Sequence, residues 1–109
     1  GICTLPSGDY VYVTNHTDSN VSVIRTSDNT VMATVNVGSH PYDICSLPSG
    51  DYVYATNSWD DNVSVIRTSD NSVVATIDVG DGPWGICSLP SGDYVYVVNC
   101  AEGSISVIN

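Results

Sequence analysis

The sequence predicts an all-β fold made of repeated four-stranded units, and three observations support this prediction. Residues 1–42 and 43–84 align without gaps and match at 29 of 42 positions, while residues 85–109 match the second copy at 15 of 25. Each copy carries short segments rich in β-branched and aromatic residues, separated by turn sequences. No apolar stripe with a 3.6-residue period lies between helix caps, which excludes a helical repeat of similar length.

Each full copy supplies four candidate strands. In the first copy the segments with strand composition are residues 2–5, 10–15, 21–24 and 31–35. Polar and turn-forming sequences separate them, at residues 6–9, 16–20, 27–29 and 37–41. Turns of this length favour antiparallel pairing of neighbouring strands.

Four short antiparallel strands in every 42 residues describe one blade of a β-propeller, whose blades pack around a central axis. Packing between blades buries both faces of a sheet, which accounts for continuous apolar runs such as Tyr94–Val98. A solenoid β-helix fits less well, because its coils are usually shorter and its strands parallel. We therefore predict propeller blades at 1–42 and 43–84, and the first three strands of a third blade at 85–109, all within one propeller or repeat assembly.

The repeat resembles the YVTN type of β-propeller repeat over the whole chain. Residues 12–15 read Tyr-Val-Thr-Asn and residues 54–57 read Tyr-Ala-Thr-Asn, each after Leu-Pro-Ser-Gly-Asp-Tyr-Val and before Asn-Val-Ser-Val-Ile. The third copy departs from this pattern at Val98, Cys100 and Asn109. The resemblance implies an extracellular or surface-layer propeller, often seven-bladed, in a superfamily that also contains lactonase-like and quinoprotein-like enzymes. It implies no catalytic residue, because the motif is the structural core of a blade.

Charge and hydropathy exclude several classes of partner. The chain has 12 acidic residues against two arginines and no lysine, for a formal charge of −10. Nucleic acids and anionic membrane surfaces require cationic groups, so we expect neither as a partner. The longest apolar run has five residues, whereas a membrane-spanning helix needs about 20, so we also expect no membrane insertion.

The loops after the second and fourth strands of each blade should lie on one face, which we call the variable face. Seven of the 13 mismatches between the first two copies fall in or beside these loops, whereas the opposite face has identical turns. Loops on a rigid frame commonly carry binding sites. The ligand-facing candidates are Tyr42, Asp43, Trp59, Asp60, Asp61 and Trp84. Neutral drift of exposed loops is the alternative, and for Tyr42 and Trp84 so is packing between blades.

Evidence for a metal or a cofactor is weak. His16 and His40, with Asp18 or Asp43, offer a mixed nitrogen and oxygen ligand set, but the next copy has Ser58 and Gly82 in place of the two histidines. The run at 60–62 lacks the regular oxygen-ligand spacing of a calcium loop. No phosphate-binding glycine motif or nucleophile elbow occurs. We therefore predict no metal and no cofactor, with His16 and His40 as the only weak metal candidates.

Three asparagines, Asn15, Asn20 and Asn62, fit the acceptor pattern for N-linked glycans. Chance is the alternative, because serine and threonine make up 24 of 109 residues. The acidity, the absence of lysine and the polar loops agree with an extracellular or cell-surface location. Glycans are therefore possible partners of the predicted protein.

The four cysteines fall into two groups. Cys3, Cys45 and Cys87 recur at the same position of the innermost strand, where neighbouring blades hold equivalent atoms roughly 8–12 Å apart. A disulfide needs Cα atoms within about 7 Å, so we expect these three to be reduced, small, buried residues. Cys100 stands alone at the entry to a variable loop and is a candidate for an intermolecular disulfide.

The sequence is compatible with two functional classes. The favoured one is a non-enzymatic extracellular building block of a surface layer, filament or adhesion structure. The alternative is a ligand-binding or enzymatic propeller, lactonase-like or quinoprotein-like, with its site on the variable face. An enzyme should vary its inner-strand starts from blade to blade, but Ile-Cys recurs at 2–3, 44–45 and 86–87, which favours the structural role.

The predicted blades are too few to close a propeller, which takes four to eight. An open array exposes apolar blade faces and an unpaired sheet edge. We therefore expect no isolated folded monomer. Either further blades of a longer repeat chain complete the structure, or copies of this chain join end to end.

Overall fold

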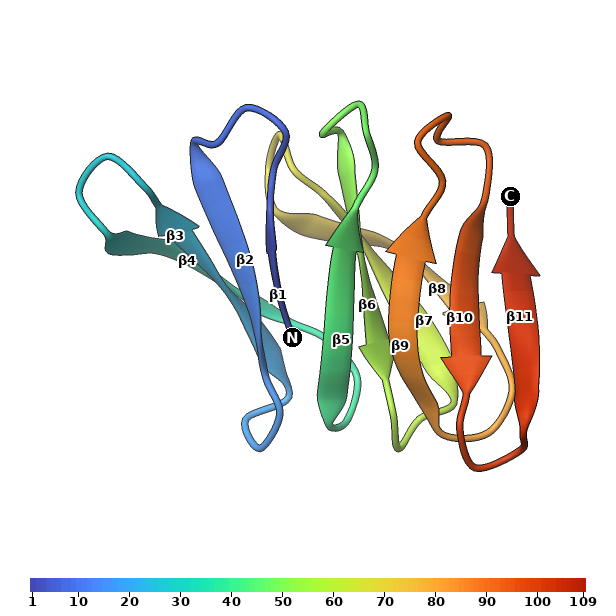
Figure 1. Ribbon diagram of the computed structural model, residues 1–109. Helices are drawn as coiled ribbons and strands as arrows, with labels where there is room; N and C mark the ends of the chain where they lie inside the picture. Colours follow the sequence, from blue (N-terminus) through green and yellow to red (C-terminus); the bar gives the residue numbers. More distant parts are fainter.

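The computed structural model describes all residues from 1 to 109 and contains eleven strands (Figure 1). The strands are β1 (Ile2–Thr4), β2 (Tyr10–Asn15), β3 (Asn20–Arg25), β4 (Thr30–Asn36), β5 (Pro41–Ser46), β6 (Tyr52–Asn57), β7 (Asn62–Arg67), β8 (Ser72–Asp78), β9 (Pro83–Ser88), β10 (Val95–Asn99) and β11 (Ser104–Ile108). The chain contains no helix long and apolar enough to cross a membrane.

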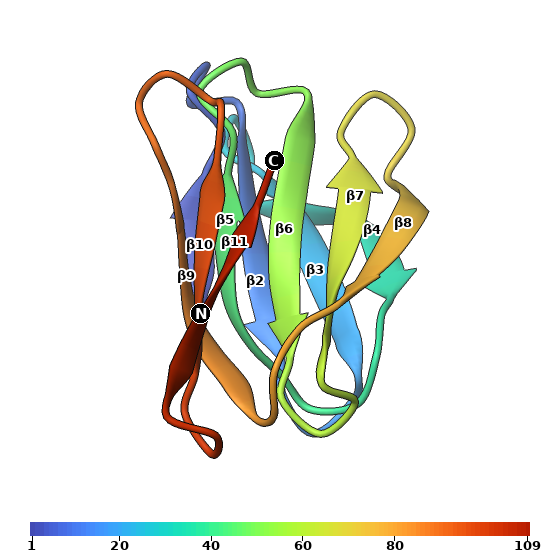
Figure 2. The ribbon, with the colours of Figure 1, turned by 90° about the vertical axis from the view of Figure 1, so that its right-hand side faces the viewer.

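The strands form three antiparallel sheets in the order of a propeller. β1 to β4 make the first sheet, β5 to β8 the second, and β9 to β11 the third, each with its strands in sequence order. We call these sheets blades 1, 2 and 3. Figure 2 shows β5 and β9 on one side of the molecule and the outer strands β4 and β8 on the other. The all-β fold with blade-like sheets of four, four and three strands is confirmed.

Apolar side chains fill the spaces between the blades. The cluster between blades 1 and 2 contains Leu5, Tyr12, Val21, Val23, Val35, Ile44, Val53, Ala55 and Ile66. The cluster between blades 2 and 3 contains Val63, Ile86, Val95, Val97 and Ile108. Val53 and Val63 are both fully buried, one in each cluster, so blade 2 is covered on both faces. This two-sided burial explains why its strands are apolar in continuous runs.

The threonine of the repeated motif ties each blade to the next. The hydroxyl of Thr56 accepts a hydrogen bond from Asp43 N, at 3.0 Å, and donates to the carbonyl of Trp84 on the inner strand of blade 3, at 2.8 Å. Thr14 donates in the same way to the carbonyl of Tyr42, at 3.3 Å. The third copy has Val98 at this position and cannot make the bond.

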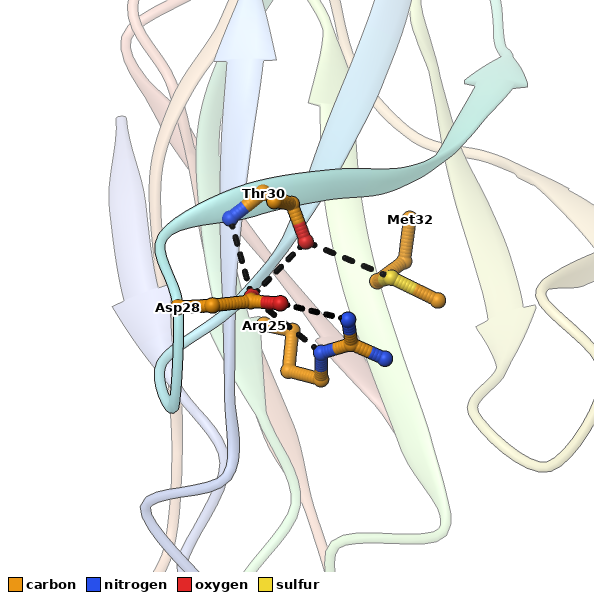
Figure 3. Close-up of polar contacts among 4 residues, drawn as sticks. All are labelled: Arg25, Asp28, Thr30 and Met32. Carbon is orange, nitrogen blue, oxygen red and sulfur yellow. Dashed lines mark hydrogen bonds and ion pairs between the residues drawn. The ribbon is translucent and has the colours of Figure 1, made fainter.

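The turns opposite the variable face are held by local polar contacts (Figure 3). Arg25 Nη2 lies 2.6 Å from Asp28 Oδ2, and Thr30 donates its backbone N–H and its hydroxyl to Asp28 Oδ1. Arg67 and Asp70 repeat the ion pair in blade 2 at 2.6 Å. The hydrogen bond and charge of each arginine hold the pKa of its partner carboxyl well below the usual range. Both pairs are exposed, so their role is to shape the turn.

The cysteines differ in part from expectation. All four are free thiols, and Cys3 and Cys45 are partly buried between blades. Cys87 is exposed, so the prediction of a buried residue is wrong there. The physical reason is that no fourth blade covers this side of blade 3.

Candidate functional site

The loops that vary between copies meet at one end of the blades, which is the lower edge of Figure 1. Backbone N–H groups of the β6–β7 loop donate to the β4–β5 loop, from Ser58 to His40 O at 3.1 Å and from Trp59 to Ser39 O at 3.3 Å. In return Asp60 Oδ2 accepts the Ser39 N–H at 2.8 Å. These bonds cross from blade 1 to blade 2 and give the variable face a fixed shape.

Three side chains from three of these loops pack together on that face. The rings of His16 and His40 meet edge to face with centroids 4.6 Å apart, and His40 stacks on Trp59 with centroids 3.3 Å apart and an interplanar angle of 18°. We call this group the imidazole–indole cluster. At the positions of its members the other copies have Ser58 and Cys100, Gly82, and Thr17 and Ala101. The blade scaffold therefore does not require any of the three rings.

A second aromatic group lies nearer the axis. Tyr42 and Trp84 stack with ring centroids 4.9 Å apart and an interplanar angle of 8°. They occupy equivalent positions on β5 and β9, beside irregularities in the register of their sheets. Both remain exposed, so they contribute to contact between blades 2 and 3 and also present ring surface to solvent. His16 joins the two groups, because its ring lies 6.3 Å from that of Tyr42.

An open pocket of about 540 Å³ lies where the two aromatic groups approach each other. Its lining residues are Gly1, Thr14, His16, Pro41, Tyr42 and Asp43. The Asp43 carboxylate is fixed by backbone N–H groups, from Ile44 to Oδ1 at 2.9 Å and from Ile86 to Oδ2 at 3.2 Å. The pocket thus combines an imidazole, a carboxylate and a phenol, which are groups that orient ligands and transfer protons.

Sequence reasoning missed Thr14 and Pro41 as pocket residues. Thr14 belongs to the repeated motif and Pro41 begins the strand β5, so each has a structural explanation that masks its place in the pocket. Thr14 and Pro41 meet in one pocket because the end of β2 in blade 1 lies beside the start of β5 in blade 2. No signal in the sequence specifies that contact.

The other two acidic candidates hold loops in place. Asp60 binds the backbone of the preceding connection, as described above, and Asp61 Oδ1 accepts the Gly82 N–H at 2.8 Å. Each uses one carboxylate oxygen for this purpose. They are therefore fixed charges on the variable face, next to Trp59 in the same loop.

The weak metal candidates do not gain a third ligand. His16 and His40 are neighbours, but no group of three histidine, cysteine, aspartate or glutamate side chains is arranged to hold a metal ion. Nδ1 of His40 is buried and has no hydrogen-bond partner. The two imidazoles therefore pack as members of the imidazole–indole cluster.

The predicted glycan acceptors lie beside the β2–β3 and β6–β7 loops. Asn15 Nδ2 already donates to Asn20 Oδ1 at 2.7 Å and to Ser22 Oγ at 2.8 Å. A glycan on Asn15 would replace one Nδ2 hydrogen and so break one of these bonds, whereas Asn20 and Asn62 act there as acceptors through Oδ1. Glycosylation of Asn15, Asn20 and Asn62 and the extracellular location stay predictions. Cys100 is exposed, and its intermolecular disulfide also stays a prediction.

Solved structures resemble this chain closely in fold. A hydrazine synthase from Kuenenia stuttgartiensis superposes with a TM-score of 0.95 at 29% sequence identity, over 99% of this chain and 31% of its own. A putative 6-phosphogluconolactonase from Bacteroides fragilis gives a TM-score of 0.88 at 21% identity, over 98% and 33%. A dihydro-heme d1 dehydrogenase in complex with DHE gives 0.83 at 18% identity, over 98% and 23%. No protein-family model and no curated protein matches the sequence.

These similarities correct the functional expectation. The similar structures named above are enzymes or a putative enzyme. Nothing supports the favoured expectation of a non-enzymatic building block of a surface layer, filament or adhesion structure. That expectation is wrong. The uniform Ile-Cys starts misled because none of these side chains lines the pocket, and Cys3, Ile44, Cys45 and Ile86 pack between blades. The chain spans a third or less of each of these proteins. It has the β-propeller fold, at the length of two blades and three strands of another.

Proposed function

We propose that this chain forms part of a ligand-binding or enzymatic β-propeller that holds a small organic molecule in the pocket of the variable face. The observation that carries the proposal is the imidazole–indole cluster. Its three rings come from three loops and meet at positions where the other copies have small or polar residues. Neutral drift explains single changes in loops, but a packed and partly exposed cluster beside a pocket is the usual form of a binding site.

The pocket also has the groups for acid–base chemistry. His16 is exposed and lines the pocket with Asp43, whose carboxylate is held by two backbone N–H groups. A neutral imidazole accepts a proton near neutral pH, and a fixed carboxylate stabilises the positive charge that results. If the bound molecule is hydrolysed, we assign His16 the role of general base. The repeats themselves we assign to the YVTN type, on the motif at 12–15 and 54–57.

The putative lactonases among the similar structures suggest a sugar lactone, but a phosphorylated one does not suit this pocket. Phosphate recognition relies on arginine, lysine or an array of backbone N–H groups. The only arginines, Arg25 and Arg67, are paired with aspartates at the opposite end of the blades. The α-ammonium of Gly1 lines the pocket but already donates to Thr14 Oγ1 at 2.7 Å and to the carbonyl of Tyr42 at 2.8 Å. A molecule without phosphate is therefore proposed.

The test is a titration of the ¹⁵N-labelled chain followed by NMR, with three probes: choline, D-glucono-1,5-lactone and 6-phosphogluconate. We expect saturable shifts of the loop amides at 16–19, 38–43 and 58–61 with at least one of the first two, and none with the third. His16→Gln should weaken the response, while Asp51→Asn, in a turn at the opposite end, should not. Absence of a saturable shift with every probe would refute the proposed function.

A further inference from the structure

The orientation of His16 at the pocket depends on the rings beside it. His16 is exposed, and an exposed side chain that nothing restrains samples several rotamers. Its ring meets the ring of His40 edge to face at a centroid distance of 4.6 Å and lies 6.3 Å from the ring of Tyr42. His16 and Tyr42 line the pocket, whereas His40 does not.

His40 is itself fixed from blade 2. Its carbonyl accepts hydrogen bonds from Ser58 N at 3.1 Å and from Ser58 Oγ at 2.7 Å. Its ring stacks on Trp59 with centroids 3.3 Å apart, and Trp59 also lies outside the pocket lining. The β6–β7 loop of blade 2 is thus connected to His16 of blade 1 through His40.

The next pair of blades joins the same loops without any ring. Cys100 N donates to the carbonyl of Gly82, the equivalent of His40, at 2.9 Å, which is the counterpart of the backbone bond just described. A Cβ atom at Gly82 would lie 2.8 Å from the Cβ of Ala101, the equivalent of Trp59. The close approach of the two loops therefore needs neither an imidazole nor an indole.

An imidazole at position 40 does not serve the stability of the loop. His40 has a φ angle of 54°, in the left-handed region, where the next copy has Gly82 at 62°. Its buried Nδ1 has no hydrogen-bond partner. Both features are unfavourable relative to glycine at this position. Residues of this kind gather at functional sites, which points to a role at the neighbouring pocket.

We infer that His40 and Trp59 are positioning residues, which hold the imidazole of His16 in one orientation at the pocket. Trp59 acts through His40, and neither of the two contacts the bound molecule. The inference rests on the proposed function and divides the imidazole–indole cluster into one residue that meets the ligand and two that support it. A base works efficiently only when a further group fixes its orientation.

The first test needs no ligand and measures the nuclear Overhauser effect between the ring protons of His16 and Tyr42 in the full chain. Trp59→Thr introduces the residue that the first copy has at this position, Thr17, so the blade should fold. We expect this variant to reduce the effect by about half or more, whereas Trp59→Phe keeps a ring and should retain most of it. An unchanged effect in Trp59→Thr would overturn the inference.

The second test is the affinity for D-glucono-1,5-lactone, measured by NMR titration of the full chain. Trp59→Thr and His40→Gly should each weaken binding about three- to tenfold. The double variant should lose no more than His40→Gly alone, because Trp59 acts through His40. Losses that multiply in the double variant would show that Trp59 acts independently, and would overturn the inference. Asp51→Asn, in a turn at the opposite end, is the control and should bind normally.

The two tests separate this inference from the proposed function. Lactone binding that weakens in His16→Gln but not in His40→Gly or Trp59→Thr would leave the proposed function in place and overturn the inference. An Overhauser effect that falls in Trp59→Thr, in a chain that binds none of the probes, would refute the proposed function and still support the positioning of His16.

Discussion

At the scale of single residues, one threonine hydroxyl joins two blades. Thr56 is fully buried, and its Oγ1 connects Asp43 N with the carbonyl of Trp84. Valine has nearly the same shape but leaves both backbone groups without this partner. We expect Thr56→Val to lower the free energy of unfolding by about 1–3 kcal/mol, measured by urea denaturation followed by circular dichroism.

The matched control is Thr76→Val, which makes the same chemical change at an exposed position on β8. It should alter stability by less than about 0.5 kcal/mol. The third copy has valine at the position of Thr56, so the strand itself accommodates the side chain. Similar losses in the two variants would show that the hydroxyl is not the source of the effect.

The thiols differ in their surroundings and should differ in reactivity. Burial, with a smaller contribution from Asp43, raises the pKa of Cys3 to about 11, and burial together with the neighbouring thiols raises that of Cys45 to about 12. Cys87 and Cys100 are exposed. Because the thiolate is the reactive form, we expect iodoacetamide at pH 8 to modify Cys87 and Cys100 first, as read by mass spectrometry of peptides. Equal rates at all four positions would contradict this.

These raised pKa values also predict how stability depends on pH. Burial raises the pKa of Tyr12 to about 12, as it raises those of Cys3 and Cys45. In the unfolded chain these groups lose their protons at lower pH, so their stabilising effect is complete below about pH 8.5 and is lost as pH rises toward 12. The urea concentration at the denaturation midpoint should therefore decrease as the pH is raised from 9 to 12. Constant midpoints over that interval would be inconsistent with burial of these groups.

At the scale of elements, each loop between blades packs against an asparagine of the following hairpin. Asn57 Nδ2 donates to Asn62 Oδ1 and Ser64 Oγ, both at 2.8 Å, and so fixes the β6–β7 turn. A Cβ atom at Gly38 would lie 2.7 Å from Asn57 Cγ. We expect Gly38→Ala to destabilise the chain by about 1–3 kcal/mol, because the buried amide has to shift.

Gly85→Ala is the control for this contact, since a Cβ at Gly85 meets no atom within 4 Å. Both variants are compared by the same denaturation assay. Gly85→Ala should be neutral or slightly stabilising, because alanine restricts the unfolded chain. If Gly38→Ala is equally well tolerated, the loop does not depend on its close approach to Asn57.

The elements were predictable because their signals are local and repeated. Strand composition and turn residues recur in every copy, so the sequence indicated four strands per blade and the two faces of loops. The candidate site was predictable only as a set of loops. The contacts of His16, His40 and Trp59 depend on how two blades pack, and nothing in the spacing of these residues specifies that they touch. The hydrogen bonds that fix the carboxylates of Asp60 and Asp61 to neighbouring loops depend on the same packing.

At the scale of the whole molecule, the two outer blade faces remain open and match each other in chemistry. Tyr12, Val21 and Val23 of blade 1 are at most 1% exposed, whereas their equivalents Tyr96, Ile105 and Val107 on blade 3 are 37%, 66% and 54% exposed. On the other side, Ile2 is 68% exposed, while its equivalent Ile44 in blade 2 is 3% exposed. The open face of blade 3 is thus equivalent to the face of blade 1 that packs against blade 2. The open face of blade 1 is equivalent to the face of blade 2 that packs against blade 1.

We predict that the 109-residue chain, when prepared alone, associates through these faces. Burying apolar surface contributes about 25 cal/mol per Å², and the partner surface is available on every copy. Sedimentation velocity at increasing concentration should show oligomers, and Ile105→Glu, which places a charge in the open face of blade 3, should dissociate them. Thr76→Glu, at an exposed position on the outer strand β8 of the middle blade, should leave them intact. A monodisperse, cooperatively folding monomer of the unmodified chain would contradict the prediction, because the open faces would then need no cover.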